Sequence, residues 1–323
     1  MIVTVTLNAA IDKTLAVPNF RLGRRHRSVE QTTMAGGKGI NVARALKTLG
    51  QPVIATGVAG GYTGTRIVEQ LTGEAILNDF VRIQGESRTS TAVVDPTSGE
   101  QTEVNERGPS VADAELDLFV DKLLYLAKGA GVVAFCGSLP AGVPADLYAT
   151  LVKELNALGV TTVLDSEGEP LRLATRAEPA IVTPNELEAE QLVGHEFDGE
   201  ADLVGAVDQM VEMGAREAIV TRPEGCVALV VEDGERRVYR VRIEPDVVDV
   251  RSGIGSGDAF LAGYVASRYT GSLPEECLRF AVACGAESVQ HFGAGVIDPR
   301  EVERLLAQVE VERLSEPALQ AGS

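Results

Sequence analysis

The sequence has few of the residues that build disulfide frameworks and metal centres. Its four cysteines lie far apart with no C-x-x-C spacing, and its three histidines form no cluster with the spacing of metal ligands. The cysteines are therefore expected to be reduced thiols, mostly in the core. A disulfide-stapled fold and a histidine-based metal centre are both disfavoured.

Long apolar runs are also missing. No stretch of eighteen apolar residues occurs, and the first five residues lack the basic region and the long apolar core of an export signal. With 323 residues, 45% of them hydrophobic and 24% charged, the composition is that of a globular chain large enough for one big α/β domain. These features predict a soluble cytoplasmic protein that does not act on a membrane.

Basic residues are scarce relative to acidic ones. The chain has 29 Lys and Arg against 47 Asp and Glu, a formal net charge of -18. This balance argues against nucleic acid as a partner, because neutralising phosphates needs a basic surface. The same field repels nucleotides, so a phosphate-handling site would need local Lys and Arg and a divalent cation. No P-loop pattern is present, so a nucleotide would have to be held in another way.

One stretch carries a strong chemical signal. Residues 252–258 read Ser-Gly-Ile-Gly-Ser-Gly-Asp and run directly into a helix-compatible segment. Three glycines in five positions let the backbone turn sharply and approach a ligand closely. The amides of Gly255, Ser256 and Gly257 would then lie at a helix N-terminus, where they suit a phosphoryl group in transit.

Asp258 follows these amides. A carboxylate repels phosphate, so its useful role there is to accept the proton of an attacking hydroxyl group. This role needs no raised pKa, because positioning does most of the work in a loose transition state. The alternative is a glycine-rich turn that serves only as a tight connection.

A second glycine cluster stands near the N-terminus. Residues 36–46 read Gly-Gly-Lys-Gly-Ile-Asn-Val-Ala-Arg-Ala-Leu, another loop that runs into a helix and carries Lys38 and Asn41. Two such loops, far apart in the sequence, predict two anionic ligands. Their pairing favours catalysis over a purely structural turn.

Together the two segments resemble the paired signatures of the ribokinase-like sugar kinases, in the phosphofructokinase B branch. The resemblance covers nearly the whole chain, from Thr4 to the helix after Pro274, and the motifs occur in the expected order. It implies a three-layer αβα fold with a mostly parallel central sheet, in a single kinase domain spanning residues 1–323. It also implies ATP and Mg²⁺ as the cofactors.

The middle of the chain agrees with an α/β fold. Helical patterns over residues 111–128 and 144–158 alternate with strand patterns over 131–136 and 160–164. Such alternation predicts a parallel sheet covered by helices on both faces. Near the C-terminus, residues 299–314 are predicted to form a closing helix.

A smaller sheet is predicted to interrupt this alternation. Short extended segments occur within residues 13–33 and 87–106, and a turn at 96–99 joins two of them. A small sheet over the carboxyl edge of the main sheet would act as a lid, which excludes water from phosphoryl transfer. The resemblance adds that members often dimerise through this lid, so a homodimer is expected.

The sugar site is expected after the first strand. A lone aspartate such as Asp12 is more often a turn former, but the resemblance implies that it contacts sugar hydroxyls, although Ala10 replaces the usual proline. The resemblance also implies that Arg88 reaches a phosphate already on the substrate, with Lys38 beside it. The other expected sugar ligands are Gly36, Gly37, Asn41 and Ser138.

Metal ligands are expected after two later strands. Asn185 and Glu188 stand three apart at the start of a predicted helix and could jointly address Mg²⁺, with Asp165 as an additional carboxylate. A helix cap would explain Asn185 equally well, although the resemblance supports the metal role. Thr183 stands where many members of the family have a lysine.

Nucleotide ligands follow from the resemblance alone. It implies that a turn after a strand at 217–221 touches the nucleotide, together with the glycine-rich loop. The residues concerned are Asn185, Thr221, Arg222, Gly225, Ser252, Gly255 and Gly257.

These expectations define an ATP-dependent kinase that phosphorylates a ketohexose phosphate. The segment Thr102–Asn105 is similar to one seen among fructose-1-phosphate and tagatose-6-phosphate kinases, which favours fructose 1-phosphate, followed by tagatose 6-phosphate and fructose 6-phosphate. A free-sugar or nucleoside kinase of the same fold is the next alternative. A non-catalytic sugar or nucleotide sensor is the alternative from another class, and the presence of Asp258 disfavours it.

Overall fold

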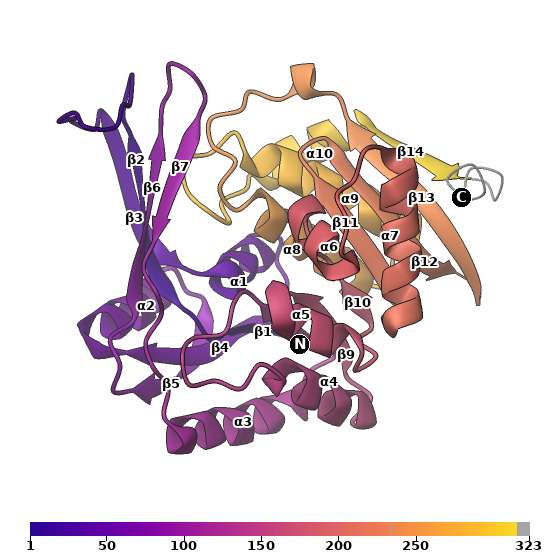
Figure 1. The fold of residues 1–323 in the computed structure, drawn as a ribbon, viewed down its shortest axis with the longest axis horizontal. Helices are drawn as coiled ribbons and strands as arrows, with labels where there is room; N and C mark the ends of the chain where they lie inside the picture. The colour runs from indigo at the N-terminus through magenta and orange to yellow at the C-terminus, as the bar shows by residue number, and fades with distance from the viewer. Residues whose placement is uncertain (233, 315–323) are drawn as a thin grey trace.

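A large sheet forms the centre of the molecule, and a small sheet stands apart from it (Figure 1). The computed structural model describes residues 1–232 and 234–314. The large sheet has ten strands in the order β14-β13-β12-β11-β10-β9-β8-β1-β4-β5. In chain order these are β1 (Ile2–Thr6), β4 (Val53–Gly60), β5 (Leu77–Ile83), β8 (Val132–Cys136), β9 (Thr161–Asp165), β10 (Ile181–Val182), β11 (Glu217–Arg222), β12 (Gly225–Glu232), β13 (Glu235–Ile243) and β14 (Val309–Leu314).

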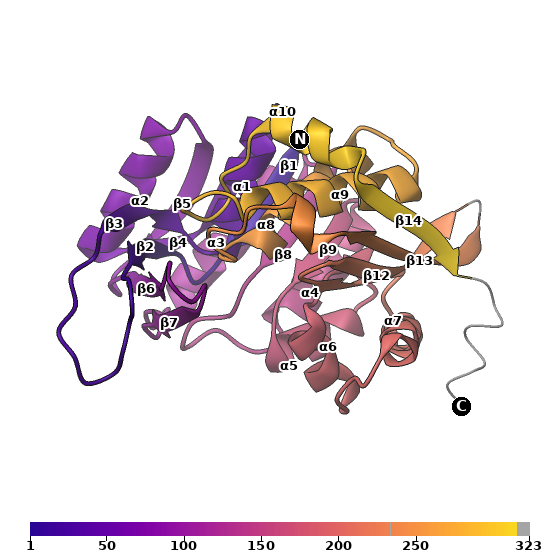
Figure 2. The same ribbon diagram turned by 90° about the horizontal axis from the view of Figure 1, so that it is seen from above.

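Helices cover both faces of this sheet, as the alternating sequence pattern predicts (Figure 2). One hydrophobic core lies under α1 (Lys38–Thr48), α2 (Gly61–Gly73), α8 (Ser256–Tyr269), α9 (Pro274–Ser288) and α10 (Pro299–Leu306). The other lies under α3 (Asp113–Ala127), α4 (Leu147–Ala157), α5 (Gly168–Thr175), α6 (Glu186–Val193) and α7 (Glu200–Met213). Within β1, Ile2 joins the first core while Val3 and Val5 join the second, because neighbouring side chains on a strand point to opposite faces.

The strands from β11 to β5 pair in parallel, and β12, β13 and β14 extend the sheet in antiparallel fashion. The predicted three-layer fold with a mostly parallel sheet is therefore confirmed. In the described part of the chain, no helix has the length and apolar character needed to cross a membrane.

The small sheet lies at the upper left of Figure 1. Its order is β3-β2-β6-β7, with β2 and β6 parallel and the other pairs antiparallel. The strands are β2 (Ala10–Ala16), β3 (Glu30–Gly36), β6 (Arg88–Val94) and β7 (Gln101–Asn105). The predicted segments within 13–33 and 87–106 thus form one sheet, although β2 begins three residues earlier and β3 ends three residues later.

The closing helix predicted over residues 299–314 is only half correct. The helix α10 ends at Leu306, and Val309–Leu314 forms β14, which pairs with β13 at the edge of the large sheet. The alternation Val-Glu-Val-Glu fits a strand, since it directs Val309 and Val311 toward the core and the two glutamates toward solvent. The open edge of β13 then supplies the hydrogen bonds.

Candidate active site

A cleft of about 1090 Å³ opens at the carboxyl edge of the large sheet. Residues at or just after the ends of parallel strands line it, which is where open α/β sheets bind their ligands. These are Thr6, Ser138, Asp165, Thr183 and Thr221. Asp12, Ser90 and Glu103 of the small sheet line the same cleft, so the small sheet forms one wall. The volume suffices for two small-molecule substrates.

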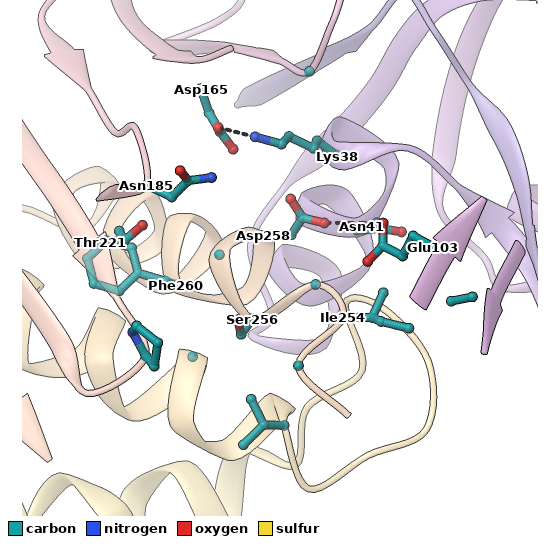
Figure 3. A pocket seen from close by; sticks show the side chains of 18 of the residues that line it. Lys38, Asn41, Glu103, Asp165, Asn185, Thr221, Ile254, Ser256, Asp258 and Phe260 are labelled. Carbon is teal, nitrogen blue, oxygen red and sulfur yellow. Dashed lines mark hydrogen bonds and ion pairs between the residues drawn. The ribbon is translucent and has the colours of Figure 1, made fainter. Parts of the chain in front are cut away.

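The glycine-rich loop forms the floor of this cleft and leads into α8 (Figure 3). Gly255, at the N-cap of α8, has φ of 78°, and a Cβ atom there would come within 2.8 Å of the Ala294 Cα atom. Only glycine fits this position. No side chain caps the helix, and Gly255, Ser256 and Gly257 all line the cleft; the N–H of Ser256 makes a long 3.4 Å contact with the Gly253 carbonyl oxygen. This arrangement suits an anion, as the sequence predicted.

Asp258 lies in the first turn of α8 and is only 6% exposed, yet it lines the cleft. Burial raises its pKa from 3.8 to about 7, and the nearby charge of Asp165 adds to the effect. Lys38 and a hydrogen bond from Asn41 act in the opposite direction. The sequence argument required no raised pKa, but a carboxylate that titrates near neutral pH is well matched to accepting a proton.

A chain of hydrogen bonds holds this carboxylate. The Nδ2 of Asn41 donates to Asp258 Oδ2 at 2.9 Å, and the Asn41 Oδ1 accepts from Nη1 of Arg44 at 3.1 Å. Both Asn41 and Arg44 belong to α1 and are buried. The second glycine cluster and Asp258 therefore meet directly, although Asn41 and Asp258 are 217 positions apart.

Lys38 faces two carboxylates. Its Nζ lies 2.8 Å from Asp165 Oδ1 (Figure 3) and 3.1 Å from Glu188 Oε1. Burial opposes the charge of Lys38, but the attraction of the two carboxylates outweighs it and raises the pKa of the lysine. The sequence argument placed this ammonium beside Arg88. In the structure it pairs with two of the expected metal ligands, and it lines the same cleft as Arg88.

Asn185 caps α6. Its Oδ1 accepts from the backbone N–H of Glu188 at 2.9 Å, and Glu188 Oε2 accepts from the backbone N–H of Asn185 at the same distance. This reciprocal pair is a capping box. Of the two alternatives for Asn185, the structure displays the cap. Among the residues it describes, it contains no cluster of three or more metal-ligating side chains.

Asp12 and Arg88 line the end of the cleft where the sugar is expected. Burial raises the pKa of Asp12, and the attraction of Arg88 opposes that rise. Arg88 donates to the backbone carbonyls of Asn8 and Glu106, which leaves the charge of its guanidinium directed at the cleft. Asn8 in turn donates from Nδ2 to Ser138 Oγ at 3.1 Å. Gly36 does not line the cleft, but it makes room for Asp12, whose Oδ2 lies 1.9 Å from where a Cβ would stand.

The opposite end of the cleft is lined by the expected nucleotide ligands. Thr221, Arg222 and Gly225 all face it, and a Cβ on Gly225 would lie 2.0 Å from the Val241 carbonyl oxygen. Apolar side chains beside them form a wall that suits an aromatic base: Ile243, Val248, Val250, Phe260, Val282 and Val289. Ser252 is the exception, because it is buried outside the cleft lining, where its Oγ accepts from the backbone N–H of Ile254.

Sequence analysis missed Glu103. It lines the cleft from β7 (Figure 3), and its carboxylate accepts from Gln101 Nε2 at 2.7 Å and from Asn105 Nδ2 at 3.4 Å. The period of two along a strand places these three polar side chains on one face, which was a usable signal. Thr183 is 5% exposed and donates to the Leu164 carbonyl, so it adds no positive charge to the cleft.

A ribokinase-like αβα fold, with a buried acid and uncapped amides facing a two-ended cleft, defines a small-molecule phosphotransferase. A model described as pfkB family carbohydrate kinase matches residues 3–300. The chain therefore belongs to the pfkB family of carbohydrate kinases, and it transfers a phosphoryl group to an alcohol acceptor. The family membership that the two motifs predicted is confirmed.

Three relatives illustrate the range of the similarity. A 1-phosphofructokinase from Borreliella burgdorferi is 31% identical over 312 residues, covering 97% of this chain and 98% of the relative. A tagatose-6-phosphate kinase from Staphylococcus epidermidis is 33% identical over 315 residues, covering 96% and 99%. The crystal structure of phosphofructokinase-2 from Escherichia coli in complex with substrates and products superimposes with a TM-score of 0.86 at 28% identity, covering 95% and 98%.

Proposed function

We propose that the protein catalyses ATP-dependent phosphorylation of a ketohexose phosphate, with fructose 1-phosphate as the first candidate and fructose 1,6-bisphosphate as its product. The observation that carries this proposal is the position of Asp258. Asp258 is buried beside the uncapped start of α8. It shares one cleft with Arg88, which lies toward one end, and with Thr221, which lies toward the other.

The sugar would lie against the small sheet. Asp12 would accept hydrogen bonds from its hydroxyl groups, and Arg88 would pair with its phosphate, since a guanidinium matches phosphate geometry. One N–H of the Asn41 amide donates to Asp258, which leaves its second N–H for the sugar. Ser138 also lines the cleft and could complete the contacts. The small sheet would exclude water as a lid.

The nucleotide would occupy the other end, with its base on the apolar wall and its phosphates directed toward the glycine-rich loop. The donor set fits Mg²⁺, because Asp165 and Glu188 already stabilise one cation, the ammonium of Lys38, between them. Two carboxylates are a usual protein contribution when nucleotide phosphates supply further oxygens. When bound, Mg²⁺ would neutralise charge on those phosphates.

Transfer would then proceed in one displacement. Asp258 takes the proton of the acceptor hydroxyl as its oxygen bonds to the γ-phosphorus, and the bond from phosphorus to the bridging oxygen breaks to release ADP. The amides from Gly255 to Gly257 hold the phosphoryl group during the transfer. A pKa of about 7 keeps a large fraction of Asp258 ionised at neutral pH.

The ranking of substrates rests on the Thr102–Asn105 segment and on relatives named for two of the phosphohexoses. Tagatose 6-phosphate and fructose 6-phosphate are the next candidates. A free-sugar or nucleoside kinase is less well supported, because Arg88 would then have no phosphate to bind. A non-catalytic sensor would have no need of Asp258.

An ADP-release assay across a panel of sugars and sugar phosphates tests the proposal. We expect turnover with ketohexose phosphates and little with free fructose or nucleosides. Arg88→Ala should raise KM for the sugar phosphate by ~10- to 100-fold, the value of a charge-assisted hydrogen bond, and leave KM for ATP unchanged. Arg172→Ala, which breaks only a surface pair with Glu169, is the matched control. Equal activity on free fructose and on its phosphates would contradict the assignment.

We further propose a cytoplasmic homodimer that forms through the small sheet. The face of this sheet turned away from Asp12 carries Leu15, Val93 and Val104, and Val104 is 65% exposed. A second copy would cover these apolar side chains, which share the face with Lys13, Thr91 and Thr102. The four buried free cysteines are compatible with the reducing cytoplasm, where ATP is available.

A further inference from the structure

Arg44 lies directly beneath the base, and no role in catalysis follows from its place in the sequence. It is 6% exposed and does not line the cleft. Its guanidinium donates to four groups that come from different parts of the chain: Asn41 Oδ1, the Ala35 carbonyl, the Ala294 carbonyl and the Glu74 carboxylate. A planar fork with five N–H donors can serve all four at once, whereas a lysine cannot.

The contact with Asn41 fixes which way its amide points. The oxygen and nitrogen of an amide occupy similar space, so an unconstrained Asn41 could rotate by half a turn. Rotation would place its Oδ1 against the carboxylate of Asp258, where two acceptors repel. Because Arg44 donates to Oδ1 at 3.1 Å, the Nδ2 must face Asp258, to which it donates at 2.9 Å.

The contact with Ala294 supports the other half of the site. Nη1 of Arg44 donates to the Ala294 carbonyl at 3.2 Å, and Ala294 packs against Gly255, the N-cap of α8. The same guanidinium therefore braces the loop that presents the amides. Base and amides share one buried support.

We propose that Arg44 is a positioning residue for phosphoryl transfer: it orients the Asn41 amide so that Asp258 is held through Oδ2 and presents Oδ1 to the acceptor hydroxyl. The proposal rests on the kinase activity proposed above. Arg44 touches neither substrate, so its loss should lower kcat and leave both KM values within about twofold. A residue that only stabilised the fold would change neither the chemistry nor the titration of the folded enzyme.

The test compares Arg44→Lys and Arg44→Met with the parent protein. We expect kcat to fall by ~10- to 100-fold, more in Arg44→Met than in Arg44→Lys, since a hydrogen bond to a charged group is lost. The Asn41 hydrogen bond favours ionised Asp258. Its loss should therefore move the acidic limb of the kcat profile upward by about one pH unit.

Arg268→Met is the matched control, because it breaks a comparable partly buried pair with Glu217 far from the base. It should lower the melting temperature and leave the acidic limb in place. A direct reading comes from the ¹³C NMR titration of Asp258 in the enzyme without substrates, with the resonance assigned by its absence in Asp258→Asn.

An upward shift of the Asp258 titration in Arg44→Lys supports the positioning role. If the parent protein phosphorylates none of the sugars tested, that result refutes the proposed function alone, and the titration still tests the positioning role. If Arg44→Met does not fold, Arg44→Lys carries the test. A titration that coincides with that of the parent, or a kcat that falls only in proportion to the folded fraction, overturns the positioning role.

Discussion

Asp258→Asn should make the protein less active and more stable at once. The replacement keeps the shape of the side chain, and its Oδ1 can still accept from Asn41 Nδ2. It cannot accept the proton of a hydroxyl group, so kcat should fall by at least ~10²-fold, the low end for a positioned base. The fold should be retained, because no cavity is created and the new amide lines the cleft, where solvent can bind it.

The gain in stability follows from the pKa of Asp258. Burial raises it from 3.8 to about 7, so between these pH values the folded protein binds more protons than the unfolded chain. The free energy of unfolding of the parent protein therefore falls as pH rises through this window. A shift of about three pH units corresponds to roughly 4 kcal/mol, all of it expressed above pH 7 and none of it below about pH 4.

Urea denaturation of both proteins at several pH values from 4 to 9 measures this difference, alongside ADP release at pH 8. We expect the curves of unfolding free energy to converge at pH 4 and to separate in favour of Asp258→Asn as the pH rises. A variant that is less stable than the parent at pH 8 would falsify the assignment of a buried, destabilised charge. Turnover within tenfold of the parent would remove Asp258 from the role of base.

Three further perturbations test separate parts of the molecule. Lys38→Met removes the ammonium between Asp165 and Glu188, so Mn²⁺ should bind the free protein at least ~10-fold more tightly in an EPR titration; unchanged affinity would mean that Lys38 does not compete with the metal. Val104→Asp places a charge on the exposed face of the small sheet and should yield monomers in analytical ultracentrifugation; a parent protein that is already monomeric would contradict the dimer. Deletion of residues 309–323 uncovers the edge of β13 and should lower the melting temperature by several degrees in a thermal scan; an unchanged value would show that β14 contributes little.

Sequence patterns identified the residues at the two ends of the cleft better than they identified which side chains pair with each other inside it. The glycine-rich loop was predictable, because the backbone at Gly255 packs so closely that only glycine fits there. The spacing of the glycines in the sequence reflects this requirement. The partners of Lys38 were not, because a long flexible side chain can reach several acceptors and Asp165 lies 127 positions away. The same limit hid the link from Arg44 through Asn41 to Asp258.

One misjudged element and one ambiguous residue have a similar origin. Residues 309–314 alternate apolar and charged side chains, a pattern that short amphipathic helices and edge strands share, and only the free edge of β13 decides between them. Asn185 fits both a cap and a metal ligand, because both roles use the same side-chain oxygen. In both cases the two alternatives are separated only by a strand that is distant in the sequence or by a metal ion that is not part of the sequence.

The hydrogen bond between Asn41 and Asp258 joins an early part of the chain to a late one. During synthesis, α1 and the first strands leave the ribosome long before α8 exists. A partly made chain can thus present the glycine cluster at residues 36–39 while it still has no carboxylate for Asn41 to hold. The carboxylate of Asp258 therefore reaches its support on α1 only after two segments 217 positions apart have folded together.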